Sequence, residues 1–137
     1  MSESAETKPL LERIGGDAAL EATVEAFYGR LLADEDLKKF FEGVPLSKLK
    51  NHQVRFLKLA FTKVPESIDV PKLMLDKHAR LFAMGLNETH FDIVAGHLVG
   101  ALESLSVPQP LIDEVVGIVG PLRPVFEEGA KNAAAAN

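Results

Sequence analysis

The chain of 137 residues contains no cysteine and no tryptophan, and it has a single tyrosine. Without cysteine there can be no disulfide, thiolate nucleophile, zinc–thiolate cluster or iron–sulfur centre. No apolar run approaches the ~18 residues of a membrane span, and the polar start MSESAETK lacks the apolar core of a signal peptide. We therefore expect a cytoplasmic protein that does not interact with membranes.

Positive charge is also scarce, because 15 Lys and Arg residues stand against 20 Asp and Glu, a formal net charge of −5. Nucleic-acid binding requires a basic patch, so this balance argues against a nucleic-acid partner. The sequence also lacks a Gly-rich phosphate loop, a GxSxG turn and histidines at zinc-binding spacing. It therefore gives no strong signal for a nucleotide-binding enzyme, a hydrolase or a zinc enzyme.

Helical periodicity dominates what the sequence does contain. Hydrophobic residues make up 47% of the chain, and they recur at helical offsets without the alternation typical of strands. Helices are predicted over residues 9–14, 17–32, 46–61, 71–84, 88–105 and from 111 onward. The sequence thus predicts one all-α domain spanning residues 1–137, with loose tails at 1–8 and 131–137.

Local signals mark where these helices begin and bend. The last helix is expected to bend near Gly120, because Pro121 and Pro124 cannot lie in a helix interior. Side chains suited to capping helix starts are those of Asp17, Ser47 and Asn87, and Asp34 is expected to cap a brief helical turn that ends at Phe40 and Phe41.

The segment Leu46–Phe61 (LSKLKNHQVRFLKLAF) carries an unusual set of side chains. Leu49, His52, Gln53 and Phe56 are spaced so that a helix places them on one face. A buried histidine or glutamine needs a hydrogen-bond partner. Other side chains or a bound ligand must therefore satisfy this face.

His78 is a second histidine in an apolar stripe, flanked at helical spacing by Met74 and Phe82. Such a histidine taken alone is more often a core residue with a hydrogen-bond partner than a metal ligand. Together with His52, however, it could approach a planar iron macrocycle from the opposite face, because imidazole is a common axial ligand of haem iron. The two histidines therefore favour haem as the ligand.

Tyr28 lies on the apolar stripe of its predicted helix, so its hydroxyl needs a partner. That partner is either a backbone carbonyl or, if Tyr28 and Gln53 converge, a small polar ligand such as dioxygen. His90 and His97 lie off the main stripe of their helix, and we interpret both as surface or structural residues.

The order of these residues resembles a known family, the truncated haemoglobins, and most closely group I from bacteria, cyanobacteria and algae. The resemblance covers the chain from about Leu10 to Leu122, and it implies a shortened globin fold with two helices packed over two around haem. The motifs that carry it are Ile14-Gly15-Gly16, Phe27-Tyr28, Phe40-Phe41, His52-Gln53, His78, His90-Phe91-Asp92 and Gly96-His97-Leu98.

The resemblance implies one haem b per chain, with His78 as the proximal iron ligand. Phe41 would pack against the porphyrin, and Leu49 would close the distal side. Phe56 and Phe91 would form apolar walls.

On the distal side the resemblance implies that Tyr28 and Gln53 stabilise bound dioxygen by hydrogen bonds. His52 matches a position at which some cyanobacterial members carry a histidine that binds iron as a sixth ligand when no gas is present. We therefore expect a bis-histidine resting state. The alternative is that His52 turns outward and hydrogen-bonds a haem propionate.

The sequence departs from the family pattern at two places. A second Gly-Gly pair usually follows the central helix, but this chain has Thr62-Lys63-Val64-Pro65 there, which leaves open the path of the predicted loop 62–70. The cyanobacterial subset also carries a late histidine that bonds covalently to a haem vinyl group. No histidine follows His97, so haem is not expected to be attached through the last helix.

The function implied by the resemblance is reversible binding of dioxygen, nitric oxide and carbon monoxide by a monomer, with a reductase as a candidate partner. Conversion of nitric oxide to nitrate is implied by the resemblance alone. Two alternatives stay open: a haem protein for electron transfer or redox sensing, and a haem-free helical interaction module in which His52 and Gln53 form a buried polar pair.

Overall fold

The computed structural model describes residues 8–63 and 67–136, and in this part of the chain every regular element is a helix. None of these helices is long and apolar enough to cross a membrane. The prediction of an all-α fold is confirmed. The elements are α2 (Leu10–Ile14), α3 (Gly16–Ala33), η1 (Lys38–Phe41), α4 (Leu46–Ala60), α5 (Val70–Lys77), α6 (Ala79–Ala83), α7 (Glu88–Ser104), α8 (Gln109–Val119), η2 (Gly120–Leu122) and α9 (Arg123–Ala136), where η1 and η2 are 3-10 turns.

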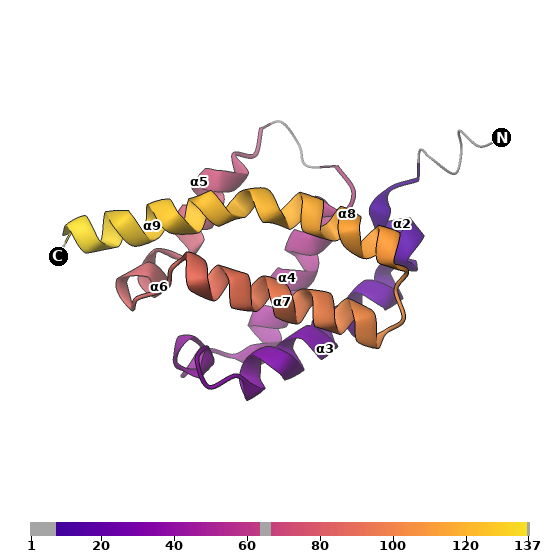
Figure 1. Cartoon of the computed structure of the whole chain (residues 1–137), viewed down its shortest axis with the longest axis horizontal. Helices are drawn as coiled ribbons and strands as arrows, with labels where there is room; N and C mark the ends of the chain where they lie inside the picture. Colours follow the sequence, from indigo (N-terminus) through magenta and orange to yellow (C-terminus); the bar gives the residue numbers. More distant parts are fainter. Residues whose placement is uncertain (1–7, 64–66, 137) are drawn as a thin grey trace.

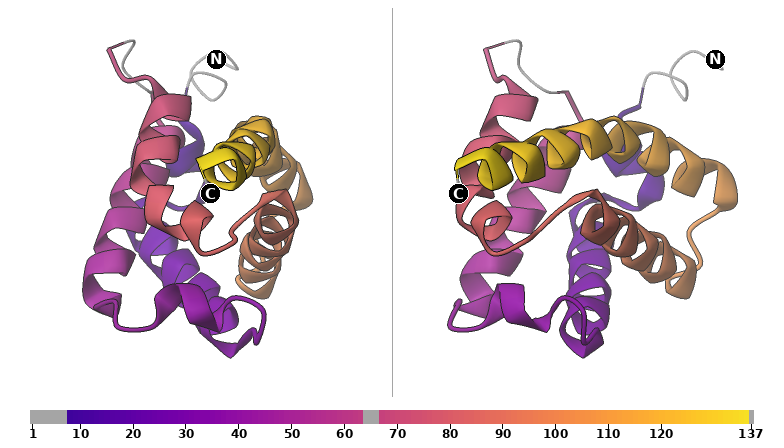
Figure 2. Two further views of the ribbon diagram at one scale, coloured as in Figure 1. Left: turned by 90° about the vertical axis from the view of Figure 1, so that its left-hand side faces the viewer. Right: turned by 60° about the vertical axis from the view of Figure 1, so that its left-hand side comes forward.

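The helices form two layers. Helix α3 packs against α4 in one layer and against α7 in the other, and α7 packs against α8 and α9. Figure 1 shows α8 and α9 running above α7, with α4 behind them. In the left-hand view of Figure 2, α3 and α4 lie on one side and α7, α8 and α9 on the other. This is the predicted arrangement of two helices over two.

The core is built on α3, which is buried along the stripe that its sequence predicts. Leu20 and Val24 are at most 1% exposed, and Phe27, Tyr28 and Leu31 continue the same face. Burying a side chain of this size contributes about 1.5–3 kcal/mol. Helix α3 therefore gives the fold its rigid centre, and the functional side chains lie around it.

The predicted helix caps at Asp17 and Ser47 are wrong. Helix α3 begins after Gly15, whose φ of 123° places it in the left-handed region that glycine tolerates, so Asp17 lies inside the helix. Helix α4 begins after Pro45, and Ser47 likewise lies inside the helix. The cap at Asn87 is confirmed, because its side chain accepts a hydrogen bond from the Thr89 backbone N–H at 2.9 Å.

The predicted helix over residues 71–84 is two helices. His78 has φ −105° and ψ 5°, outside the helical range, and it ends α5 and precedes α6. The N-terminus of α5 is capped by Asp69, whose carboxylate accepts a hydrogen bond from the Lys72 backbone N–H at 3.1 Å. The chain thus places His78 at a break between two short helices.

The C-terminal region bends where its prolines predict. Helix α8 ends at Val119, the turn η2 spans Gly120–Leu122, and α9 then continues to Ala136. Residues 131–136 are therefore helical, where the sequence predicts a loose tail. The predicted N-terminal tail, apart from Lys8, and residues 64–66 of the predicted loop lie outside the described residues.

Candidate functional site

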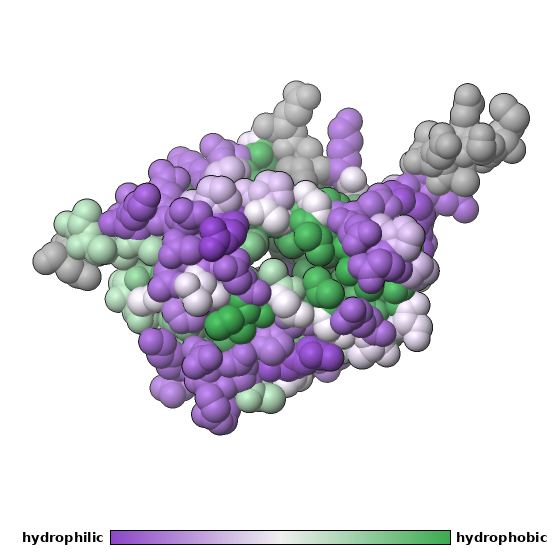
Figure 3. Space-filling model, in the orientation of Figure 1, coloured by the Kyte–Doolittle hydropathy of each residue, from purple (hydrophilic) through white to green (hydrophobic). Residues whose placement is uncertain are grey.

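Large apolar side chains around the core are left only half-covered by the chain itself. Helix α4 has one buried residue, Leu57, and α5 has none. Figure 3 shows that this face of the molecule is hollowed near its centre, with hydrophobic residues at the edge of the hollow. A flat apolar ligand is the kind of group that completes such walls. The half-buried side chains packed against the core include Phe41, Leu49, Phe56, Met74, Leu75 and Phe91.

His78 lies at the junction of α5 and α6 and is half-buried. Its Nδ1 lies 2.8 Å from the backbone carbonyl oxygen of Met74. A carbonyl oxygen only accepts hydrogen bonds, so Nδ1 carries the proton and the lone pair of Nε2 is free. Burial lowers the pKa of His78, and the hydrogen bond to Met74 opposes this shift in part. His78 is therefore a neutral imidazole suited to bind a metal.

Aromatic rings surround the His78 imidazole on the protein side. The centroid of the Phe126 ring lies 5.3 Å from that of His78, and the Phe82 centroid lies 6.2 Å away. Phe126 also lies 5.0 Å from Phe91 of α7. Sequence reasoning missed Phe126, whose only local signal is its helical spacing from Leu122.

Tyr28 is buried on α3, with its ring edge-to-face against Phe27 at 5.6 Å and Phe41 at 6.1 Å. Burial raises the pKa of Tyr28 to about 12, so the phenol keeps its proton and can donate a hydrogen bond to an acceptor. Within the described residues no fully enclosed side-chain nitrogen or oxygen lacks a partner. The Tyr28 hydroxyl makes no hydrogen bond to a described residue, so it cannot be one of these enclosed atoms. It therefore borders open space and is not paired with a backbone carbonyl.

The predicted apolar stripe of α4 is narrower than the sequence suggests. Leu49, Gln53 and Phe56 are half-buried, whereas His52 is exposed. A helix turns by about 100° per residue, so His52 lies at the edge of the stripe that the other three define. The prediction that all four side chains share a buried face is wrong for His52, which is exposed.

His90 and His97 both have structural partners. The Nδ1 atom of His90 accepts a hydrogen bond from the Asn87 backbone N–H at 3.1 Å and completes the cap of α7. The Nε2 atom of His97 lies 2.7 Å from the Asp34 carboxylate, and this contact lowers the pKa of Asp34. The interpretation of both as structural is confirmed. No cluster of three or more His, Asp or Glu side chains in the described residues suits a metal ion.

Comparison with known proteins decides what such a site belongs to. The family described as bacterial-like globin matches residues 9–127. A group 1 truncated haemoglobin from Mycolicibacterium paratuberculosis is 38% identical over 125 residues, which cover 91% of this chain and 88% of that protein. The chain belongs to the bacterial-like globins, within the group 1 truncated haemoglobins.

Solved structures of truncated haemoglobins share the fold. THB4 of Chlamydomonas reinhardtii is 44% identical with a TM-score of 0.76, over 86% of this chain and 94% of that one. The 2/2 haemoglobin of Synechococcus sp. PCC 7002, in the cyanomet state and with covalently attached haem, is 38% identical with a TM-score of 0.75, over 87% and 98%. Family membership implies a haem-binding protein that takes a gaseous ligand such as oxygen.

The residues of this truncated haemoglobin fit a haem group. A neutral imidazole with a free Nε2 packs against Phe126 of α9, half-buried apolar side chains surround the core, and a protonated phenol on α3 borders open space. These are the three features that a haem site in a helical protein needs: an axial ligand, an apolar enclosure and a polar group for the gas.

The raised pKa of Tyr28 gives a testable pH dependence. We expect the ¹³Cζ signal of this single tyrosine to titrate near pH 12. The pKa of Tyr28 in the folded protein lies above the unfolded value of about 10. The contribution of the protonated phenol to the free energy of unfolding is therefore complete below pH 10 and is lost as the pH rises to about 12. A signal that titrates near pH 10 in the folded protein would show that the phenol is not buried.

Proposed function

We propose that this truncated haemoglobin binds one haem b without a covalent bond and reversibly binds dioxygen, nitric oxide and carbon monoxide. The observation that carries the proposal is His78, whose Nδ1 proton is engaged by the Met74 carbonyl while its Nε2 is free. Haem supplies an iron at which a diatomic gas can bind. Non-covalent binding is supported by the absence of any histidine after His97.

The apolar walls would hold the porphyrin. Phe41 extends from η1, Leu49 and Phe56 from α4, and Phe91 from α7, and all four are half-buried. Covering them with a porphyrin would remove apolar surface from water, at about 25 cal/mol for each Å². We assign Phe41 to packing on the porphyrin, Leu49 to closing the distal side, and Phe56 and Phe91 to its walls.

Tyr28 and Gln53 would stabilise the gas on the distal side. They lie on α3 and α4, which pack against each other. The phenol keeps its proton throughout the neutral pH range, and the carboxamide has N–H donors. Both side chains can therefore donate to a diatomic ligand that carries partial negative charge.

His52 would serve as an exchangeable sixth ligand. Its exposed position at the edge of the α4 stripe suits a side chain that must leave the iron before a gas binds. The apparent affinity for the gas would then fall in proportion to the fraction of molecules with the site open. Two axial imidazoles would also suit electron transfer, which is the second candidate function. The competing role for an exposed His52 is a hydrogen bond to a propionate.

Conversion of nitric oxide and dioxygen to nitrate is a further candidate activity of this site. It would require an electron donor such as a reductase, and the acidic, cysteine-free composition suits a monomer acting in the cytoplasm.

Replacing His78 with alanine tests the proximal assignment. We expect hemin-saturated His78→Ala to lose its haem absorption on desalting, because no other described imidazole combines burial with a free Nε2. His97→Ala serves as the matched control, since it removes an imidazole held by Asp34, and it should retain haem. Retention of haem with unchanged ferric and ferrous spectra in His78→Ala would overturn the assignment.

Replacing His52 with alanine tests the sixth ligand. The ferrous wild-type protein should show sharp, split visible bands, and His52→Ala should lose them and bind carbon monoxide faster. Asn51→Ala, at the neighbouring exposed position of α4, should keep the wild-type spectrum. An unchanged spectrum in His52→Ala would favour the propionate role instead.

Replacing Tyr28 with phenylalanine tests the distal donor. A hydrogen bond to a charged acceptor contributes about 1.5–3 kcal/mol, so dioxygen should dissociate at least about tenfold faster from Tyr28→Phe. Carbon monoxide provides the control within the same variant, because it accumulates little charge and its dissociation rate should change little. Equal dioxygen dissociation rates in Tyr28→Phe and wild type would remove Tyr28 from the site.

A further inference from the structure

We propose that three residues fix the orientation of the His78 imidazole: Phe126 and Gly129 of α9 and Phe82 of α6. We call this group the proximal clamp. It rests on the proposed function, in which His78 holds the iron. In this arrangement the bent C-terminal helix is a positioning element for the haem ligand.

Phe126 is the centre of the clamp. Its ring lies 5.3 Å from His78, 5.6 Å from Phe82 and 5.0 Å from Phe91. It therefore joins the α5–α6 junction, α6 and α7 to α9, and it is only 7% exposed. All these contacts are tilted or edge-to-face, the geometry that aromatic pairs prefer. Rotation of the His78 ring about its Cβ–Cγ bond would disturb the packing of the whole cluster.

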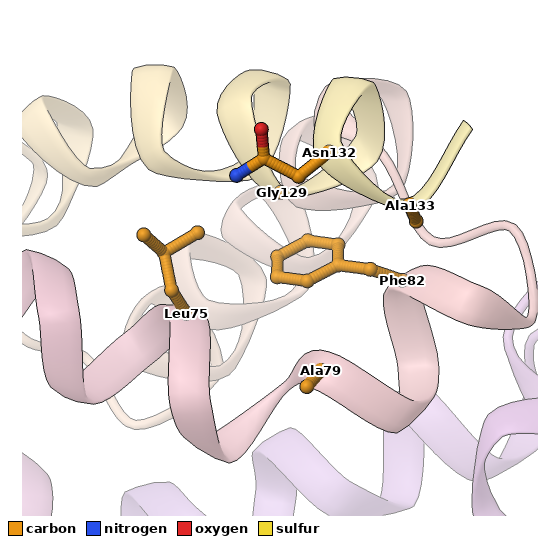
Figure 4. A pocket seen from close by; sticks show the side chains of 6 residues that line it. All are labelled: Leu75, Ala79, Phe82, Gly129, Asn132 and Ala133. Atoms are coloured by element: carbon orange, nitrogen blue, oxygen red, sulfur yellow. The ribbon is translucent and has the colours of Figure 1, made fainter. Parts of the chain in front are cut away.

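Gly129 allows the Phe82 ring to approach α9. A Cβ atom built on Gly129 would lie 2.6 Å from Cδ2 of Phe82 and closer still to Cε2 and Cζ of the same ring. Figure 4 shows the Phe82 ring reaching toward α9 at Gly129, with Leu75 beside it. Glycine in a helix costs about 1 kcal/mol relative to alanine. Contact between the ring and the bare backbone is a structural reason for glycine at this position.

A cavity beside the ring provides a route for its displacement. The cavity has a volume of about 250 Å³. A side chain at position 129 could push the Phe82 ring into this space without unfolding the helices, because a ring shifts by side-chain rotation alone. The contact between Phe82 and His78, at 6.2 Å, would then be lost. The cavity is lined by Leu75, Ala79, Phe82, Gly129, Asn132 and Ala133.

The clamp complements the hydrogen bond from Nδ1 to Met74. That bond restrains one edge of the imidazole, whereas the rings of Phe82 and Phe126 restrain its plane. Together they would direct Nε2 along one line and keep water from the protein side of the ligand. The apolar shell of a metal site in general controls solvent access and redox potential.

Phe126→Leu tests the clamp by removing the ring while keeping an apolar side chain. We expect hemin transfer to a scavenger apomyoglobin to become about tenfold faster, the low end for outer-shell changes at metal sites. The haem methyl ¹H shifts of the ferric cyanide form, which depend on the plane of the proximal imidazole, should also change. Phe61→Leu is the matched control, because Phe61 is 1% exposed and outside this ring cluster, and it should leave both readouts at wild-type values.

Gly129→Ala tests the same clamp from the other side. Displacement of Phe82 should again change the haem methyl shifts, whereas Gly117→Ala in α8, where an added Cβ meets nothing within 4 Å, should not. Wild-type shifts and transfer rates in both Phe126→Leu and Gly129→Ala would overturn the clamp while leaving haem binding intact. Retention of haem by His78→Ala would instead overturn the proposed function on which the clamp rests.

Discussion

The hydrogen bond between Nδ1 of His78 and the carbonyl oxygen of Met74, 2.8 Å long, is the interaction on which the haem site depends. It forms where α5 ends and α6 begins, with His78 itself outside the helical range. It fixes the tautomer, and burial keeps the ring neutral. A single backbone contact thus leaves Nε2 as the nitrogen that would bind iron in the proposed function, and the surrounding rings would set its direction.

The rest of the fold has a well-buried core on α3, whereas α4 and α5 are largely uncovered. Helix α3 is buried along its whole apolar face, so it holds Tyr28 rigidly at the edge of the open region. The exposed flank of α4 and the short helices α5 and α6 are less constrained, and they carry His52 and His78. In the proposed function this division would keep the Tyr28 donor fixed while His52, the proposed sixth ligand, moves.

The sequence predicts the parts of this structure that local chemistry decides. Asn87 caps α7, Pro121 and Pro124 bend the chain at Gly120, and the motif order identifies the family. Two features follow no such signal. No glycine or proline marks the break at His78. The residues joined by its hydrogen bond, Met74 and His78, are four apart, which is also the spacing of a continuous helix. The sequence therefore gives no sign of the break. The contact between Phe126 and His78 spans separate helices, and helical spacing carries no information about such pairs.

The central claim is that the imidazole of residue 78 binds haem iron through Nε2. A crystal structure of the hemin-saturated protein tests it most directly. The account predicts an Fe–Nε2 bond to His78, with Nδ1 still bonded to the Met74 carbonyl oxygen. Iron held by a different side chain on the proximal side, or haem seated outside the walls formed by α4 and α7, would contradict it.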